Sequence, residues 1–203
     1  MIKNIIFDLG NVLISFKPAE YLEERNYQEP LKRTILSDIF ASEEWILLDN
    51  AEISIDQAIE RIANKSALKK DLIAFLLNER SEILYPLHLN TKLLPELKKN
   101  GFRLFYLSNF PFDMWEHVRA GNNGYDFFKY FDGGIISAEV HCSKPDPIIY
   151  ELLLGKHTLN AEECLFIDDL ETNIKTAVRA GMKGFMTSGS TDIYEAVLKV
   201  LGG

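Results

Sequence analysis

Short apolar runs alternate with longer segments whose apolar positions recur at helical spacing along most of this chain. Each run is followed by turn residues, as expected where a buried strand ends and a helix follows. The runs are NIIF (4–7), RLFYL (103–107), GGIIS (133–137), CLFI (164–167) and KGFM (183–186). Strands that alternate with helices form a parallel sheet, so we predict an α/β fold with a doubly wound parallel sheet.

Residues 17–88 interrupt this alternation. Leucine and isoleucine recur there at i, i+3 and i+4 spacing, with no convincing strand between the helical stretches. The stretches are AEYLEERN, LKRTILSDIF, ISIDQAIERIA and LKKDLIAFLLNER. We therefore predict an inserted all-helical cap domain at residues 17–88 and a core domain made of residues 1–16 and 89–203.

Chemically active side chains follow four of the five apolar runs. In open parallel sheets, ligands bind beyond the carboxyl ends of the strands, so side chains at these positions are expected to share one site. The side chains are Asp8, the pair Ser108-Asn109, Lys144 in CSKPDPIIY, and the pair Asp168-Asp169. Neighbouring carboxylates repel one another, and a bound cation together with a lysine would resolve that repulsion.

These four motifs, in this order, resemble those of the haloacid dehalogenase (HAD) superfamily of hydrolases, most of which are phosphatases. LSN, SKPDPIIY and FIDDLETNI are similar to the subgroup with bacterial α-glucose-1-phosphatase and the N-terminal phosphatase domain of soluble epoxide hydrolase. The resemblance covers nearly the whole core and implies a Rossmann-like HAD core. The helical insertion lies where the superfamily places its first type of cap.

The resemblance implies a role for each catalytic position. Asp8 would be the nucleophile that takes the phosphoryl group, which divides one difficult displacement into two easier ones. Ser108, with the backbone amide of Asn109, would hold the phosphoryl oxygens. Lys144 would neutralise the charge that the phosphate shares with Asp8. The expected substrates are small phosphorylated metabolites, with sugar 1-phosphates among them.

The resemblance also implies a magnesium site. Asp8, Asp169 and the backbone carbonyl of Gly10 would bind Mg²⁺, with Asp168 either a further ligand or a support for the others. A hard cation with oxygen ligands suits phosphoryl chemistry.

Gly10 departs from the DxDGT pattern that is familiar in these phosphatases. The second Asp of that pattern protonates the leaving oxygen and later activates water. Such general acid–base catalysis typically raises the reaction rate by about 10²–10⁴-fold. Without it, we expect sugar 1-phosphates, acyl phosphates and aryl phosphates to react better than primary alkyl phosphates. A water molecule, Asn11 or a cap residue such as Glu52 could instead replace the missing acid, and the sequence leaves this open.

Two other functions remain possible from the sequence. A haloacid-type dehalogenase would tolerate the loss of the second Asp, because halide leaves without a proton. A catalytically weak binding or regulatory protein could have kept the fold alone.

The cap sequence suggests where substrate selection occurs. We expect a mobile cap that is hinged near Ser15-Phe16 and His88-Leu89 and excludes water. Substitutions between Trp45 and Glu52 should change which phosphates are accepted, although simple packing is the more ordinary role for Trp45 itself.

Composition narrows the partners. The chain has 203 residues and a formal net charge of −8, which disfavours nucleic acid and anionic membrane surfaces as partners. Cys142 and Cys164 lack metal-ligand spacing and suit a reducing compartment, so we expect a cytoplasmic protein. We expect no membrane span. The sequence leaves open whether the protein is a monomer or a homodimer.

Overall fold

The computed structural model describes residues 1–121 and 124–187, together with Ile193 and Val197. The described core is built on a five-stranded parallel sheet with the strand order β5-β4-β1-β6-β7. These strands are β1 (Asn4–Phe7), β4 (Arg103–Ser108), β5 (Gly133–Ile136), β6 (Cys164–Asp168) and β7 (Lys183–Met186). All five apolar runs predicted as strands are confirmed. The predicted core beyond residue 187 lies outside the described residues, apart from Ile193 and Val197.

Strand β1 lies at the centre of the sheet, between β4 and β6. Phe7 is in register with Tyr106 on one side and with Ile167 on the other. The three strands therefore end at nearly the same level, and the polar residues that follow them emerge together.

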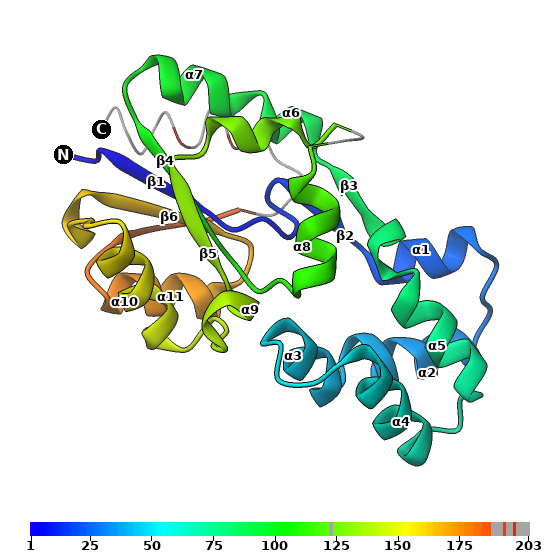
Figure 1. Ribbon diagram of the computed structural model, residues 1–203. Coiled ribbons are helices and arrows are strands. Elements are labelled where there is room, and N and C mark those ends of the chain that lie inside the picture. The colour runs from blue at the N-terminus through cyan, green and yellow to red at the C-terminus, as the bar shows by residue number, and fades with distance from the viewer. Residues whose placement is uncertain (122–123, 188–192, 194–196, 198–203) are drawn as a thin grey trace.

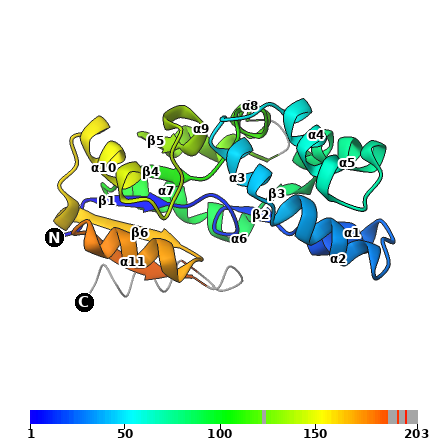
Figure 2. The ribbon, with the colours of Figure 1, turned by 90° about the horizontal axis from the view of Figure 1, so that it is seen from below.

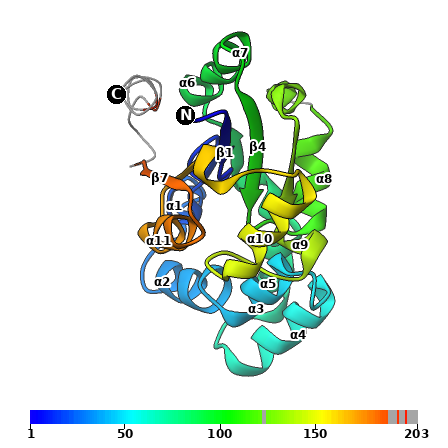
Figure 3. The ribbon, with the colours of Figure 1, turned by 90° about the vertical axis from the view of Figure 1, so that its left-hand side faces the viewer.

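Helices cover both faces of this sheet, as predicted for a doubly wound fold. Figures 1 and 3 show α6 (His88–Thr91) and α7 (Leu93–Lys99) over one face and α10 (Pro147–Lys156) and α11 (Glu171–Arg179) over the other. Because side chains alternate along a strand, β1 serves two apolar clusters: Ile5 and Phe7 belong to one and Ile6 to the other. The remaining core elements are α8 (Phe112–Arg119), η3 (Asp126–Tyr130), α9 (Ser137–Val140) and η4 (Ala161–Glu163).

The cap is a helical insertion between the first and second core strands, and it lies beyond the carboxyl ends of the strands (Figures 1 and 2). It has an apolar cluster of its own, including Leu22, Ile35, Ile39, Ile62 and Leu77. Its elements are α1 (Pro18–Glu24), α2 (Leu31–Ile35), η1 (Leu36–Phe40), α3 (Glu43–Asp49), α4 (Ile55–Lys65), α5 (Lys70–Asn78) and η2 (Arg80–Ile83). The inserted helical cap confirms the predicted fold class.

Two short strands connect the cap to the core. Strand β2 (Ile14–Phe16) pairs in antiparallel fashion with β3 (Leu84–Pro86). The sequence analysis found no convincing strand between residues 17 and 88, and β3 corrects that reading. A strand of three residues is too short to show a clear alternation of apolar and polar positions. The division at 16/17 and 88/89, and the mobility of the cap, stay predictions.

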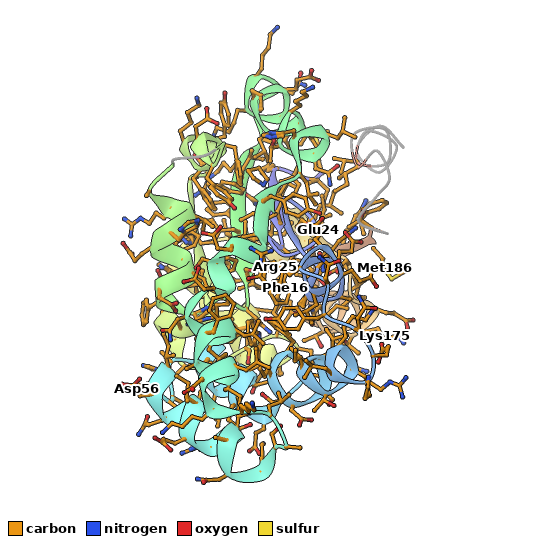
Figure 4. The ribbon with its side chains drawn as sticks, turned by 90° about the vertical axis from the view of Figure 1, so that its right-hand side faces the viewer. Phe16, Glu24, Arg25, Asp56, Lys175 and Met186 are labelled. Carbon is orange, nitrogen blue, oxygen red and sulfur yellow. The ribbon has the colours of Figure 1, made fainter. Side chains whose placement is uncertain are left out.

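Phe16 and Trp45 lie where the cap meets the core. Both pack against the core cluster as well as the cap cluster, and their ring centroids are 5.5 Å apart. Figure 4 shows Phe16 near the middle of the molecule, whereas Asp56 lies at the outer edge of the cap. Over the described residues, no helix combines the length and hydropathy that a membrane-crossing segment needs.

Candidate active site

Asp8 is buried at the carboxyl end of the central strand. Its backbone N–H donates to the Ile167 carbonyl at 2.8 Å, which extends the β1–β6 pairing by one residue. The Leu9 backbone N–H and the Ser108 hydroxyl donate to Asp8 Oδ1 at 2.7 and 2.8 Å. The first predicted pair, Asp8 and Ser108, is thus in direct contact although 100 residues separate them.

Lys144 joins the two buried carboxylates of the site. Its Nζ lies 2.9 Å from Asp8 Oδ1 and 2.7 Å from Asp168 Oδ2. All three side chains are buried. A buried charge is tolerated only when it is paired and hydrogen-bonded, so each of the three depends on the other two.

The carboxylate of Asp168 is occupied by donors from the core. Asn173 Nδ2, from the first turns of α11, lies 3.0 Å from each oxygen of Asp168. The Leu170 backbone N–H donates to Asp168 Oδ1 at 2.8 Å. Together with Lys144, these donors favour Asp168 as a support for the lysine over Asp168 as a direct metal ligand.

Asn109 fixes the segment that carries Lys144. Its Oδ1 accepts from the Lys144 backbone N–H at 2.8 Å, and its Nδ2 donates to the Lys144 carbonyl at 3.0 Å. The loop after β4 and the loop before α10 are therefore bound to each other. Asn109 was selected from the sequence for its backbone amide, and the structure adds this contact of its side chain.

The donor set fits a divalent cation. Asp8, Asp168 and Asp169 each offer a carboxylate oxygen, and these oxygens lie within 4.8 Å of one another. The hydrogen bonds described for Asp8 go to its Oδ1. Gly10 lies on the side of Asp8 Oδ2, because a Cβ atom added at Gly10 would be 4.0 Å from that oxygen. Oxygen ligands around a partly solvated site are those that Mg²⁺ prefers.

Burial and neighbouring charge shift the pKa values of the site. Burial raises the pKa of Asp8 to about 6; Lys144 opposes this rise, and Asp168 and Asp169 add to it. Burial also raises the pKa of Asp169, again with help from Asp168. Burial lowers the pKa of Lys144, but its two carboxylate partners raise it by more, so the net shift is upward. A cation beside Asp8 and Asp169 would favour their charged forms.

A cavity of about 210 Å³ opens above Asp8, between core and cap. Its core side includes Asp8, Gly10, Ser108, Lys144 and Asp169, so the structure brings together all the predicted site residues, Asn109 among them. Its remaining walls are largely apolar. They include Phe16, Trp45, Leu84, Phe110, Pro111, Met114 and Leu170.

The end of helix α3 is bound to the core beside this cavity. Ser137, the residue after β5, donates its hydroxyl to the Asp49 backbone carbonyl and accepts from the Phe110 N–H at 2.9 Å. His141 Nδ1 lies 2.8 Å from the Asn50 carbonyl oxygen. These contacts join the cap to the core beside the cavity.

Sequence reasoning missed Asn173, Ser137 and Asp49 in this region. Asn173 lies five residues after Asp168 in FIDDLETNI, and an amide in the first turns of a helix after an acidic pair was the available signal. Ser137 ends the run GGIIS and directly follows its apolar residues, as Asp8 and Ser108 follow theirs. Asp49 lies in the segment from Trp45 to Glu52 that was expected to select substrate. Its own role was not predicted, because only folding brings the end of α3 to the cavity.

Comparison with known proteins identifies the family of this chain. The family model for haloacid dehalogenase-like hydrolases matches residues 2–181. The chain is 30% identical to a sesquiterpene phosphatase of Aspergillus oryzae over 188 residues, which cover 93% of this chain and 91% of that protein. It is 25% identical to a phosphorylated carbohydrates phosphatase of Thermotoga maritima, over 88% of this chain and 82% of that one.

A solved structure supports the fold. A HAD-family enzyme of Bacteroides thetaiotaomicron, solved in complex with magnesium and inorganic phosphate, superimposes with a TM-score of 0.76. The two chains are 20% identical, and the match covers 97% of this chain and 99% of that one. With the ordered motifs, the parallel sheet and the inserted cap, these matches place the chain in the haloacid dehalogenase-like hydrolase family.

Proposed function

We propose that this protein is a Mg²⁺-dependent phosphatase that works through an aspartyl phosphate on Asp8. The observation that carries the proposal is the position of Asp8 at the base of the cavity, where Lys144 and Ser108 contact one of its oxygens and Asp169 lies nearby. The phosphatases among the similar proteins support the same class of reaction.

The first step would transfer the phosphoryl group to Asp8. A carboxylate oxygen of Asp8 forms a bond to phosphorus while the bond to the leaving oxygen breaks. Ser108 and the Asn109 amide would hold the phosphoryl oxygens, and Lys144 would offset their charge. A water molecule then attacks phosphorus, which releases inorganic phosphate and restores Asp8.

Asp8, Asp169 and the Gly10 carbonyl would hold the magnesium ion. When bound, the ion supplies positive charge to the phosphoryl oxygens. Lys144 and Ser108 keep Asp8 oriented towards the cavity, and the closed cap limits the access of water.

For the substrate, we propose small phosphorylated metabolites and, more specifically, sugar 1-phosphates. Trp45 and Asp49 lie on the cap side of the cavity. An aromatic ring beside a carboxylate suits a sugar, because the ring packs on the apolar face and the carboxylate accepts from hydroxyls. The similar phosphatase of phosphorylated carbohydrates supports this choice.

A phosphate ester of an apolar alcohol is the second candidate. Phe16, Leu84, Phe110 and Met114 give the cavity an apolar wall, and one similar protein is a sesquiterpene phosphatase. The specificity constants for a hexose 1-phosphate, a hexose 6-phosphate and a prenyl phosphate separate the two candidates. A higher kcat/KM for the 1-phosphate supports the first candidate, and a higher value for the prenyl phosphate supports the second.

The dehalogenase and the non-catalytic alternatives are less well supported. The carboxylates around Asp8 suit a cation and hence a phosphate, and the cavity contains a complete set of the proposed groups.

Hydrolysis of an aryl phosphate tests the proposed reaction. We expect turnover with Mg²⁺, reversible loss in excess chelator, and background rates in Asp8→Asn, which keeps the shape of the side chain but removes the nucleophile. Release of halide from a 2-haloacid without metal would favour the dehalogenase, and absence of turnover on both substrates would favour a binding protein. Full activity of Asp8→Asn would contradict the proposal.

A further inference from the structure

Position 10 supplies no acid to the reaction. A Cβ atom added at Gly10 would lie 4.0 Å from Asp8 Oδ2, and no other atom would be nearer. The φ angle of Gly10 is not positive. Glycine is therefore not required there by crowding or by backbone conformation. A proton for the leaving oxygen must come from another group or from water.

The cap places one carboxylic acid at the cavity, Asp49. It is the last residue of α3 and lines the same cavity as Asp8 and Lys144, on the cap side. In an in-line displacement the leaving oxygen departs on the side opposite the nucleophile. Because Asp8 forms the core side, the leaving group would face the cap and Asp49.

The backbone around Asp49 is fixed to the core. Ser137 donates to the Asp49 carbonyl, and His141 contacts the carbonyl of Asn50. Helix α3 also packs against α9. Asp49 is thus positioned over the site by the contacts that close the cap.

Asp49 is also able to carry a proton near neutral pH. Burial raises its pKa to about 7, while Arg80 of η2 lowers it and Asp113 of α8 raises it. Arg80 is itself paired with Asp113 at 2.6 Å, which weakens its attraction for Asp49. A group that titrates near the working pH is suited to both donating and accepting protons.

Three other charged groups on the elements around α3 have partners of their own. Lys65 of α4 pairs with Glu44 at 2.6 Å. Asp38 of η1 accepts from Ser66 at 2.5 Å, and Glu139 of α9 pairs with Lys156 at 3.3 Å. Among the charged groups, Arg80 and Asp113 are the ones that act on the pKa of Asp49.

We propose that Asp49 is the general acid and base that replaces the missing Asp of the first motif. Its carboxyl group gives a proton to the leaving oxygen as the bond from that oxygen to phosphorus breaks. The resulting carboxylate takes a proton from the water that attacks the aspartyl phosphate, so each turnover restores the acid. This inference rests on the proposed phosphatase reaction.

The two residues that the sequence suggested for this role are placed less well. Glu52 is exposed and accepts from Asn50 Nδ2 at 3.0 Å. Asn11 lines the cavity, but its Oδ1 accepts from the Phe16 N–H at 3.0 Å, and a carboxamide does not titrate near neutral pH.

The test compares wild type, Asp49→Asn, Glu52→Gln and Asp56→Asn with phosphate esters of graded leaving-group acidity, from aryl to primary alkyl. Asp49→Asn should lower kcat/KM for a primary alkyl phosphate by about 10²–10⁴-fold. It should lower kcat/KM for p-nitrophenyl phosphate less than about tenfold, because that leaving group needs no proton. Asp56→Asn removes an exposed carboxylate at the outer edge of the cap and should match wild type. Glu52→Gln tests the other candidate acid of the cap, and it should leave the dependence of kcat/KM on leaving-group acidity unchanged.

The pH profile gives a second readout that a structural role would not produce. The wild-type rate on the alkyl phosphate should fall as the pH rises through about 7, because Asp49 loses the proton that it donates. The rate of Asp49→Asn should not fall in this pH range. In the wild type, kcat/KM should depend only weakly on the acidity of the leaving group, because Asp49 supplies the proton. The steep dependence that the sequence analysis expected from the missing acid at position 10 should appear only in Asp49→Asn.

Two results would overturn the inference. Equal losses on all esters in Asp49→Asn would show a general disturbance of the site, and no loss on the alkyl ester would show that Asp49 transfers no proton. In both cases hydrolysis of the aryl phosphate by wild type would leave the proposed function standing. Failure of wild type to hydrolyse any ester would instead overturn the proposed function and the role of Asp49 with it.

Discussion

At the scale of single residues, the site is organised by one buried lysine between two buried carboxylates. Lys144 reaches Asp8 and Asp168 at 2.9 and 2.7 Å, and Asn173 completes the donors around Asp168. The sequence allowed Asp8 and the acidic pair to be selected, because each lies at the end of a strand whose position in a parallel sheet is predictable. Lys144 was selected because it lies in the motif CSKPDPIIY, a few residues after another such strand. It did not distinguish the part of Asp168 from that of Asp169, because hydrogen-bond partners are set by packing.

Removal of Lys144 tests this network through stability. Lys144→Ala should lower the free energy of unfolding by about 3–5 kcal/mol, because it leaves two carboxylates buried without their cation. The loss should shrink at low pH, since protonation of Asp8 removes one of the unpaired charges. Urea unfolding measures the effect.

The control is Lys175→Ala, at an exposed position of α11 that Figure 4 shows at the periphery. This substitution should lower the free energy of unfolding by less than about 1 kcal/mol. Equal losses in the two variants would contradict the network.

Titration of Asp49 should also affect stability. Its pKa is raised from 3.8 to about 7, so between these values the folded protein holds a proton that the unfolded chain has released. Stability from this group is complete below about pH 4 and is lost as the pH rises through about 7. Asp49→Asn removes that loss.

The measurement is the free energy of unfolding of Asp49→Asn minus that of wild type, followed with pH in the presence of chelator. This difference should grow in favour of the variant by about 1–3 kcal/mol between about pH 4 and pH 8. A difference that does not change with pH would mean that burial does not raise the pKa of Asp49.

At the scale of elements, the sheet and the ends of the cap differ in how far the sequence predicts them. The five core strands follow from apolar runs, because strands buried on both faces are continuously apolar. Helix α3 and the pair β2–β3 were missed. The apolar residues of α3, in EEWILLD, are consecutive and so show no helical period. Strand β3 has three residues, too few for a clear alternation, and it depends on pairing with β2.

Trp45 on α3 should contribute to substrate selection. It lines the cavity and packs against Phe16 and Phe40, so Trp45→Ala should enlarge the cavity on the cap side. We expect kcat/KM for sugar phosphates to fall about tenfold or more, and hydrolysis of a small aryl phosphate to change much less. Steady-state kinetics on both substrates check this. A uniform loss on the two substrates would indicate that Trp45 serves only the packing of the cap.

At the scale of the whole molecule, a chain with a net charge of −8 is proposed to bind an anionic substrate. The buried ammonium of Lys144 and the proposed cation concentrate positive charge at the carboxyl ends of β1, β4 and β6, although the rest of the chain carries excess negative charge. Fold class and motif order could be predicted because they depend on local patterns. The contacts of the end of α3 with Ser137 and His141 could not be predicted, because they join segments about 90 residues apart.

The central claim is that a phosphoryl group is transferred to Asp8, and trapping it there is the most direct test. Enzyme that is turning over p-nitrophenyl phosphate with Mg²⁺ is quenched in acid, digested and analysed by mass spectrometry. The account predicts that the peptide containing Asp8 gains the mass of one phosphoryl group, and that Asp8→Asn gains none. A phosphoryl group found on another residue would contradict it. Turnover that releases phosphate while the Asp8 peptide stays unmodified at every quench time would contradict it as well.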